Sequence, residues 1–98
     1  MDDVALHSGD RSVTVDGQPV ALTGAEFNLL EVLLRHAGQV VSRDTLAENA
    51  LSAASSHYGR SLDTHVAHLR KKLGPNAQGK MRILSVRGVG YQYILPWG

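Results

Sequence analysis

The chain contains no cysteine, and this absence excludes both a disulfide framework and a thiolate metal site. Nothing in the sequence therefore requires an oxidising compartment. Long hydrophobic runs are also missing, since no apolar stretch approaches the roughly 20 residues that a membrane-spanning helix needs. The acidic start Met1-Asp2-Asp3 is unlike a signal peptide. We therefore expect a cytoplasmic protein without membrane contact.

The chain also lacks a large excess of positive or negative charge, because its formal net charge is only +1. The charges are unevenly distributed, however. Residues 1–59 carry three basic and eight acidic side chains, whereas residues 60–98 carry seven basic side chains and one acidic side chain, Asp63. Such asymmetry is typical of a protein with a surface that binds a polyanion. The alternative is that basic residues cluster by chance on a solvated face.

A length of 98 residues suits one domain, and a composition of 43% hydrophobic and 19% charged residues excludes an intrinsically disordered chain. We predict a single α+β domain over residues 1–98. The expected elements are an N-terminal antiparallel sheet at about 3–22, three helices at about 24–37, 43–51 and 61–73, and a C-terminal β-hairpin at about 82–95.

The N-terminal sheet is predicted from alternating apolar residues around a turn. Asp16-Gly17, a dipeptide favoured in tight hairpins, separates two such pairs, Val13 with Val15 and Val20 with Leu22. Ala5-Leu6-His7 predicts a further short strand. Pro19 has no N–H for a strand ladder, so its strand is expected to lie at a sheet edge or to begin there.

The helix ends are predicted from capping residues. Thr23 and Glu26 have the spacing of a capping box, in which each side chain satisfies a backbone N–H of the first turn. Ser42 is expected to cap the second helix. Gly38 is placed to end the first helix in a left-handed conformation, and Gly74-Pro75 to stop the third.

Two stretches lack helical periodicity. Val40-Val41 is too short for more than a β-bridge, and residues 52–60 are small, polar and aperiodic. The second stretch is interpreted as a loop between helices, and its length suggests a function.

The predicted third helix has two unlike faces. At 100° per residue, an apolar stripe faces the core, formed by Leu62, Val66, Leu69 and Leu73. The opposite face is narrow, polar and cationic, and it presents Arg60, Thr64, Ala67, His68 and Lys71, flanked by Ser61, Asp63, His65, Arg70 and Lys72. A DNA major groove about 12 Å wide admits one helix with such a face. The alternative for Arg70-Lys71-Lys72 is that these cations only answer the helix dipole.

The hairpin that follows favours the DNA interpretation. Arg87-Gly88-Val89-Gly90 sets a basic side chain beside a tip of small residues. An arginine is well suited to a narrow minor groove, where the negative potential is enhanced. Helix and hairpin together would read two adjacent grooves.

From Leu22 to Leu95 the chain resembles the effector domain of OmpR/PhoB-type response regulators of bacterial two-component systems. Four ordered segments carry the resemblance: Leu22-Thr23-Gly24-Ala25-Glu26-Phe27-Asn28-Leu29-Leu30; Gly38-Gln39-Val40-Val41-Ser42-Arg43; Arg60-Ser61-Leu62-Asp63-Thr64-His65-Val66 with Leu69-Arg70-Lys71-Lys72-Leu73; and Val86-Arg87-Gly88-Val89-Gly90-Tyr91. The resemblance implies a winged helix-turn-helix fold, with the third helix in the major groove and Arg87 of the wing in the minor groove.

The resemblance also implies partners. Members of the family regulate transcription, and they bind as dimers on tandem half-sites, so we expect a monomer in isolation and a dimer on double-stranded DNA. In such proteins the loop between the second and third helices can touch RNA polymerase, which places Ser55, Ser56, His57 and Tyr58 in a polymerase-contact loop. The usual N-terminal receiver domain is missing from this chain. We therefore expect an isolated effector domain or a fragment.

The expected DNA-binding residues are Arg60, Ser61, Thr64, His65, His68, Arg70, Lys71, Lys72 and Arg87. Phosphate contact is the preferred role for Arg60, Arg70, Lys71 and Lys72, because backbone neutralisation dominates affinity. Arg70 has an alternative, which is pairing with a carboxylate of the second helix. Base-edge contact is assigned to Thr64, His68 and Lys71. Asp63 is interpreted as an orienting residue that holds Arg60 or a helix N-terminus.

Other chemistries are not supported. His65 and His68 lie one turn apart, but no third ligand accompanies them, so we predict no metal site and no cofactor. Gly88-Val89-Gly90 lacks the following helix of a nucleotide loop. No motif arranges Ser, His and Asp as a catalytic triad, so we expect no enzyme. The alternative function is a protein-interaction module with an incidental basic face.

Overall fold

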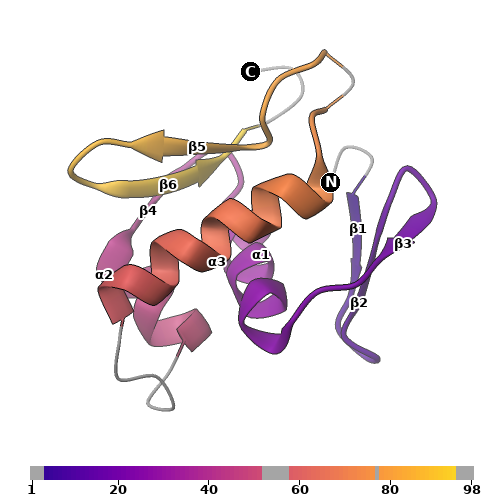
Figure 1. Cartoon of the computed structure of the whole chain (residues 1–98), viewed down its shortest axis with the longest axis horizontal. Coiled ribbons are helices and arrows are strands. Elements are labelled where there is room, and N and C mark those ends of the chain that lie inside the picture. Colours follow the sequence, from indigo (N-terminus) through magenta and orange to yellow (C-terminus); the bar gives the residue numbers. More distant parts are fainter. Residues whose placement is uncertain (1–3, 52–57, 77, 95–98) are drawn as a thin grey trace.

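The computed structural model describes residues 4–51, 58–76 and 78–94, and for residues 50, 51 and 58–61 it describes the backbone alone. Two three-stranded antiparallel sheets lie on opposite sides of the helices (Figure 1). The first sheet has the order β1-β2-β3, formed by Val4–His7, Ser12–Val15 and Gln18–Val20. The second has the order β4-β6-β5, formed by Val40–Ser42, Gly90–Tyr93 and Ile83–Val86.

The N-terminal sheet follows from its turn chemistry. Asp16 and Gly17 both have positive φ angles, 52° and 80°, as the tight hairpin turn between β2 and β3 requires. The register pairs Val13 with Val20 across this turn. Pro19 lies on β3, an edge strand, so its missing N–H costs no ladder hydrogen bond.

The first helix, α1, spans Gly24–Arg35 and begins with the predicted capping box. The Glu26 backbone N–H donates to Thr23 Oγ1 at 3.2 Å, and the Thr23 N–H donates to Glu26 Oε1 at 3.0 Å. The helix ends two residues before the predicted bound at 37. Gly38 has a φ of 84° and donates its N–H to the carbonyl of Tyr93, which turns the chain toward the second sheet.

The second helix differs from the single helix predicted at 43–51. It consists of α2, Arg43–Leu46, followed by a π-helical turn, η1, over Ala47–Leu51. Ser42 caps it as predicted, since its Oγ accepts from the Thr45 N–H at 3.1 Å. The Asn49 side-chain amide donates to the Thr45 carbonyl, which is the acceptor that the Asn49 backbone would use in an α-helix.

Residues 40–42 form a strand, so the expectation of no more than a bridge was wrong. Val40, Val41 and Ser42 pair with Gln92, Tyr91 and Gly90 of β6. The two backbones can approach closely because position 90 is a glycine; a Cβ there would overlap the Val41 carbonyl oxygen. This short stretch forms a strand because it pairs with β6, which is distant in the sequence. Local periodicity gives no sign of such a pairing.

The third helix, α3, spans Tyr58–Leu73, so it begins three residues earlier than predicted. Residues 58–60 therefore belong to the helix and not to the loop predicted at 52–60. The rest of that predicted loop, residues 52–57, lies outside the described part of the chain. Gly59 suggested a loop, but glycine only lowers helix propensity and does not forbid a helix. The helix ends as expected before Gly74, which has a φ of 70°.

The core confirms the predicted orientation of α3. Leu62, Val66, Leu69 and Leu73 are at most 4% exposed and pack in one cluster with Leu29, Leu30 and Leu33 of α1 and with Tyr93 of β6. The stripe that faces the core leaves the opposite side of α3 to the solvent. In Figure 1 this helix crosses in front of α1, between the two sheets.

Candidate nucleic-acid interface

The outward face of α3, which we call the reading face, is formed by Thr64, Ala67, His68 and Lys71, all of them exposed. At 100° per residue, the three polar members fall within about 60° of one another, opposite the core stripe. The backbone of Arg60 and Ser61 lies in the first turns of the same helix, whereas their side chains lie outside the described part. The hydrogen-bonding side chains of Thr64 and His68 and the cation of Lys71 thus point outward on the same side of the helix.

His65 lies at the margin of the reading face. Its side chain is half-buried, and its Nδ1 atom is enclosed without a hydrogen-bond partner among the described residues. His68, by contrast, is 59% exposed, with its Nδ1 atom 3.8 Å from Glu26 Oε2. Of the two histidines, His68 is the one available to a ligand on this face.

Lys72 is held by a buried carboxylate of α1, which argues against the predicted phosphate contact. Its Nζ lies 2.6 Å from Glu26 Oε1, and Glu26 is only 1% exposed. Burial alone would raise the pKa of the Glu26 carboxyl, but the hydrogen bonds from Lys72 and Thr23 and the Lys72 charge outweigh it and lower that pKa. The Lys72 ammonium therefore neutralises the protein's own anion.

The side chain of Arg70 is likewise held by hydrogen bonds within the domain. Its Nε donates to the Ile83 carbonyl at 3.0 Å, and its Nη2 donates to Ser85 Oγ at 2.7 Å. Its guanidinium carbon also lies 5.5 Å from the centre of the Tyr91 ring. The partner of Arg70 is thus the hairpin strand β5 and not a carboxylate of the second helix, and its contacts fasten the hairpin to α3.

Asp63 orients neighbouring elements through Arg43 and Tyr91, whereas the side chain of Arg60, its predicted partner, lies outside the described part. Asp63 accepts hydrogen bonds from Arg43 Nη1 and Nη2, at 2.7 and 3.3 Å, and from the Tyr91 hydroxyl. The Arg43 and Tyr91 hydrogen bonds favour the ionised form and lower the pKa of Asp63. Burial and the Asp63 carboxylate raise the pKa of Tyr91. These contacts with Asp63 were not predicted, because nothing local connects positions 43, 63 and 91.

Arg87 is exposed in the turn that joins β5 and β6. Gly88 has a φ of 78°, and the Val89 N–H donates to the Val86 carbonyl at 3.0 Å, which closes the turn. The Val89 carbonyl accepts from the Arg43 N–H at 3.1 Å, so the tip is anchored at the start of α2. Figure 1 shows the tip at the same end of the molecule as α2 and the first turns of α3.

The predicted polymerase-contact loop is mostly outside the described residues. Ser55, Ser56 and His57 fall in the stretch that is not described, and Tyr58 is described only as the first backbone position of α3. Within the described part, no three His, Cys, Asp or Glu residues are grouped so that they could hold a metal ion. No helix there has the length and apolarity to cross a membrane.

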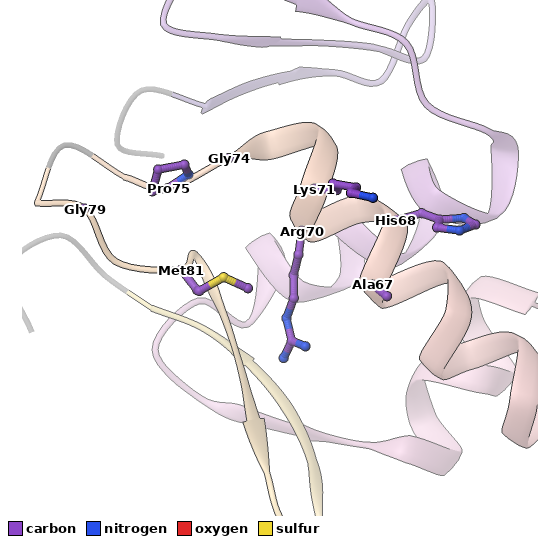
Figure 2. A pocket seen from close by; sticks show the side chains of 8 residues that line it. All are labelled: Ala67, His68, Arg70, Lys71, Gly74, Pro75, Gly79 and Met81. Carbon is purple, nitrogen blue, oxygen red and sulfur yellow. The ribbon is translucent and has the colours of Figure 1, made fainter.

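A hollow opens beside the reading face, between the C-terminal half of α3 and the segment that leads into β5 (Figure 2). Residues of α3 form one wall, and the other wall includes Met81, which is 51% exposed. His68 and Lys71 belong both to the reading face and to the lining of this hollow. Met81 was not predicted as a site residue, since a lone methionine between a polar linker and a strand carries no pattern.

Residues 17–93 match the family described as "Transcriptional regulatory protein, C terminal". Over 94 residues the chain is 38% identical to the transcriptional regulatory protein CpxR of Escherichia coli K12, and the match covers 96% of this chain and 40% of CpxR. The solved DNA-binding domain of E. coli CpxR has a TM-score of 0.85 at 36% identity, covering 96% of this chain and 92% of that one.

The DNA-binding domain of Klebsiella pneumoniae RstA, solved in complex with the RstA box, has a TM-score of 0.79 at 37% identity. That match covers 94% of this chain and 91% of the RstA chain. The solved domains are thus similar to this chain over nearly their whole length, whereas the chain spans 40% of the length of the curated relative CpxR.

Proposed function

The chain belongs to the family of C-terminal effector domains of OmpR/PhoB-type transcriptional regulators, and from this premise we propose that it binds double-stranded DNA sequence-specifically. The family consists of winged-helix DNA-binding regulators and not of enzymes. The observation that supports the proposal most directly is the reading face, because Thr64, His68 and Lys71 project from one side of α3. These side chains can donate to or accept from base edges in a major groove about 12 Å wide.

Arg87 is proposed as the contact to the adjacent minor groove. Its place at the exposed tip of the hairpin supports this role, as does the hydrogen bond that anchors the tip at the start of α2. A guanidinium is attracted to a narrow minor groove because the potential there is most negative. Reading two grooves at a set spacing would give more specificity than the helix alone.

The proposed phosphate contacts are Lys71 and Arg60. Lys71 is exposed, and Arg60 lies in the first turn of the helix that carries it. Arg70 and Lys72 are left out of this set because β5 and Glu26 occupy their charged groups. The domain would therefore gain fewer phosphate contacts than a count of its basic residues suggests.

The roles of a longer protein are proposals as well. CpxR extends well beyond the matched part, so we propose that an upstream receiver domain would pair two such effector domains on tandem half-sites. Pairing raises the local concentration of the second domain and hence the avidity. We retain the stretch from Ser55 to Tyr58 as the proposed contact with RNA polymerase.

The test is selection of bound duplexes from a random pool, followed by titration of the best duplex at several salt concentrations. If phosphates are engaged, log affinity should fall with log salt by about 0.9 for each phosphate contacted. A scrambled duplex of the same length is the control for specificity. A shallow slope, with equal affinity for any acidic polymer, would instead favour a protein-interaction module.

A further inference from the structure

The hollow beside the reading face is large and mainly apolar on its far side. Its volume of about 670 Å³ lies within the roughly 300–1,000 Å³ of small-molecule sites. It is lined by Ala67, His68, Arg70 and Lys71 of α3, by Gly74 and Pro75 at the helix end, and by Gly79 and Met81. Figure 2 shows the Met81 side chain directed toward α3, with the Arg70 side chain next to it in the view.

The far wall is held in place by hydrogen bonds of its own. Asn76, only 7% exposed, accepts at Oδ1 from the N–H groups of Gln78 and Lys80, at 2.9 and 3.0 Å. The Asn76 N–H donates to the Lys80 carbonyl at 2.8 Å, and Arg82 Nη2 donates to the Pro75 carbonyl at 3.2 Å. An antiparallel bridge joins Pro75 to Met81. Contacts within the protein thus hold the described part of this wall in place.

The lining combines cations with small or apolar groups. Lys71 and His68 stand at the rim that adjoins the reading face, and Lys80 is exposed on the opposite segment. Gly79 carries no side chain, and the space around its position is open, so a ligand can come close to the backbone. Among the described residues that line the hollow there is no carboxylate. This pattern suits a ligand that alternates anionic groups with compact, weakly polar ones.

We propose that this hollow holds the sugar-phosphate backbone of the DNA strand that passes beside α3, with Met81 packed against a deoxyribose and Lys71 near its phosphate. The inference rests on the proposed function, because the hollow continues the reading face through His68 and Lys71. It extends the interface beyond helix and wing to the segment between them. Met81 would then increase the affinity for DNA without affecting sequence specificity, since sugar and phosphate carry no sequence information.

The test uses the duplex obtained by selection and the variant Met81→Glu. A carboxylate on the wall would face the DNA phosphates, so affinity at low salt should fall about tenfold, and equally for specific and scrambled duplexes. The loss should shrink as salt screens the repulsion. Met81→Leu, which keeps the apolar contact, should bind as the wild type does. Met81 is half-exposed, so a thermal melt of Met81→Glu should match that of the wild type.

The matched control is Leu84→Glu, which adds the same charge at a position 46% exposed. Ser85 and Tyr91 face α3 through Arg70, so Leu84, which alternates with Ser85 on β5, points to the other side of the sheet. Its affinity should stay within about twofold of the wild type, because its charge is remote from the DNA.

A measurement on the wild type complements the variants. Phosphates flanking the bases read by α3 should give interference when they are ethylated, and this interference should disappear in Met81→Glu. If Met81→Glu binds as tightly as Leu84→Glu, or if the interference pattern of Met81→Glu equals that of the wild type, the hollow does not hold DNA although the proposed function stands. If the wild type binds no duplex, the proposed function itself fails and this inference with it.

Discussion

The Tyr91 hydroxyl donates a hydrogen bond to Asp63 Oδ1 and so joins strand β6 to the exposed side of α3. The same carboxylate receives two hydrogen bonds from Arg43 of α2. Farther along α3, Arg70 reaches Ser85 of β5. The angle between the reading face and the hairpin that carries Arg87 is therefore set by side chains that touch no DNA in our proposal.

Tyr91→Phe tests this connection with the loss of one oxygen. Asp63 keeps its Arg43 partner, so the free energy of unfolding should fall by only about 1–2 kcal/mol. DNA affinity should fall further than this small loss suggests, because the hairpin would no longer hold a set angle. Urea denaturation and duplex titration measure the two effects. An unchanged affinity, with an unchanged preference at the flanking minor groove, would count against a positioning role.

The Glu26–Lys72 pair predicts a loss of stability in acid. The pKa of Glu26 is lowered in the folded state from its ordinary value of 4.5. Its contribution to stability is thus fully present above pH 4.5 and is lost as the pH falls through the lower, folded-state pKa. Urea denaturation as a function of pH should show this decline, and Glu26→Gln should flatten it. A decline of equal size in Glu26→Gln would assign the effect to other groups.

Lys71→Ala and Lys72→Ala should behave differently although the residues are neighbours. Lys71→Ala should lower the slope of log affinity against log salt by about one unit, with little effect on stability. Lys72→Ala should leave the slope unchanged but destabilise the domain by about 1–3 kcal/mol, because it strands the buried Glu26 carboxylate. This figure is below that for a fully buried pair, since Lys72 is partly exposed to screening solvent. Equal salt slopes for the two variants would overturn the distinction.

Arg87→Ala should weaken DNA binding and relax the preference for A·T-rich sequence next to the site read by α3. The physical reason is that a narrow A·T-rich minor groove concentrates negative potential, which the guanidinium senses. Repeating the duplex selection with the variant measures the preference directly. Arg87 is exposed, so the melting temperature should not move. Selection of the same flanking sequence by the variant would contradict the wing role.

Many structural features of this protein can be predicted from residues that are close together in the sequence. The capping box of Thr23 and Glu26, the turn at Asp16-Gly17 and the buried stripe of α3 were all predicted and are all present. Each depends on residues within a few positions of one another, and the geometry of a helix or turn fixes how such residues meet. The order of sheet, helices and hairpin follows from these local signals, whereas the family follows from the resemblance of four sequence segments.

The partners of the charged side chains, by contrast, depend on how distant elements pack. Lys72 meets Glu26 across 46 positions, and Tyr91 meets Asp63 across 28. Residues 40–42 became a strand because β6 lies beside them. Contacts of this kind depend on which elements pack together, and a basic residue looks the same in sequence whether its partner is a phosphate or a buried carboxylate. Packing, and not composition, therefore separates Lys71, which has no partner among the described residues and is proposed to contact DNA, from Lys72, which pairs with the buried Glu26.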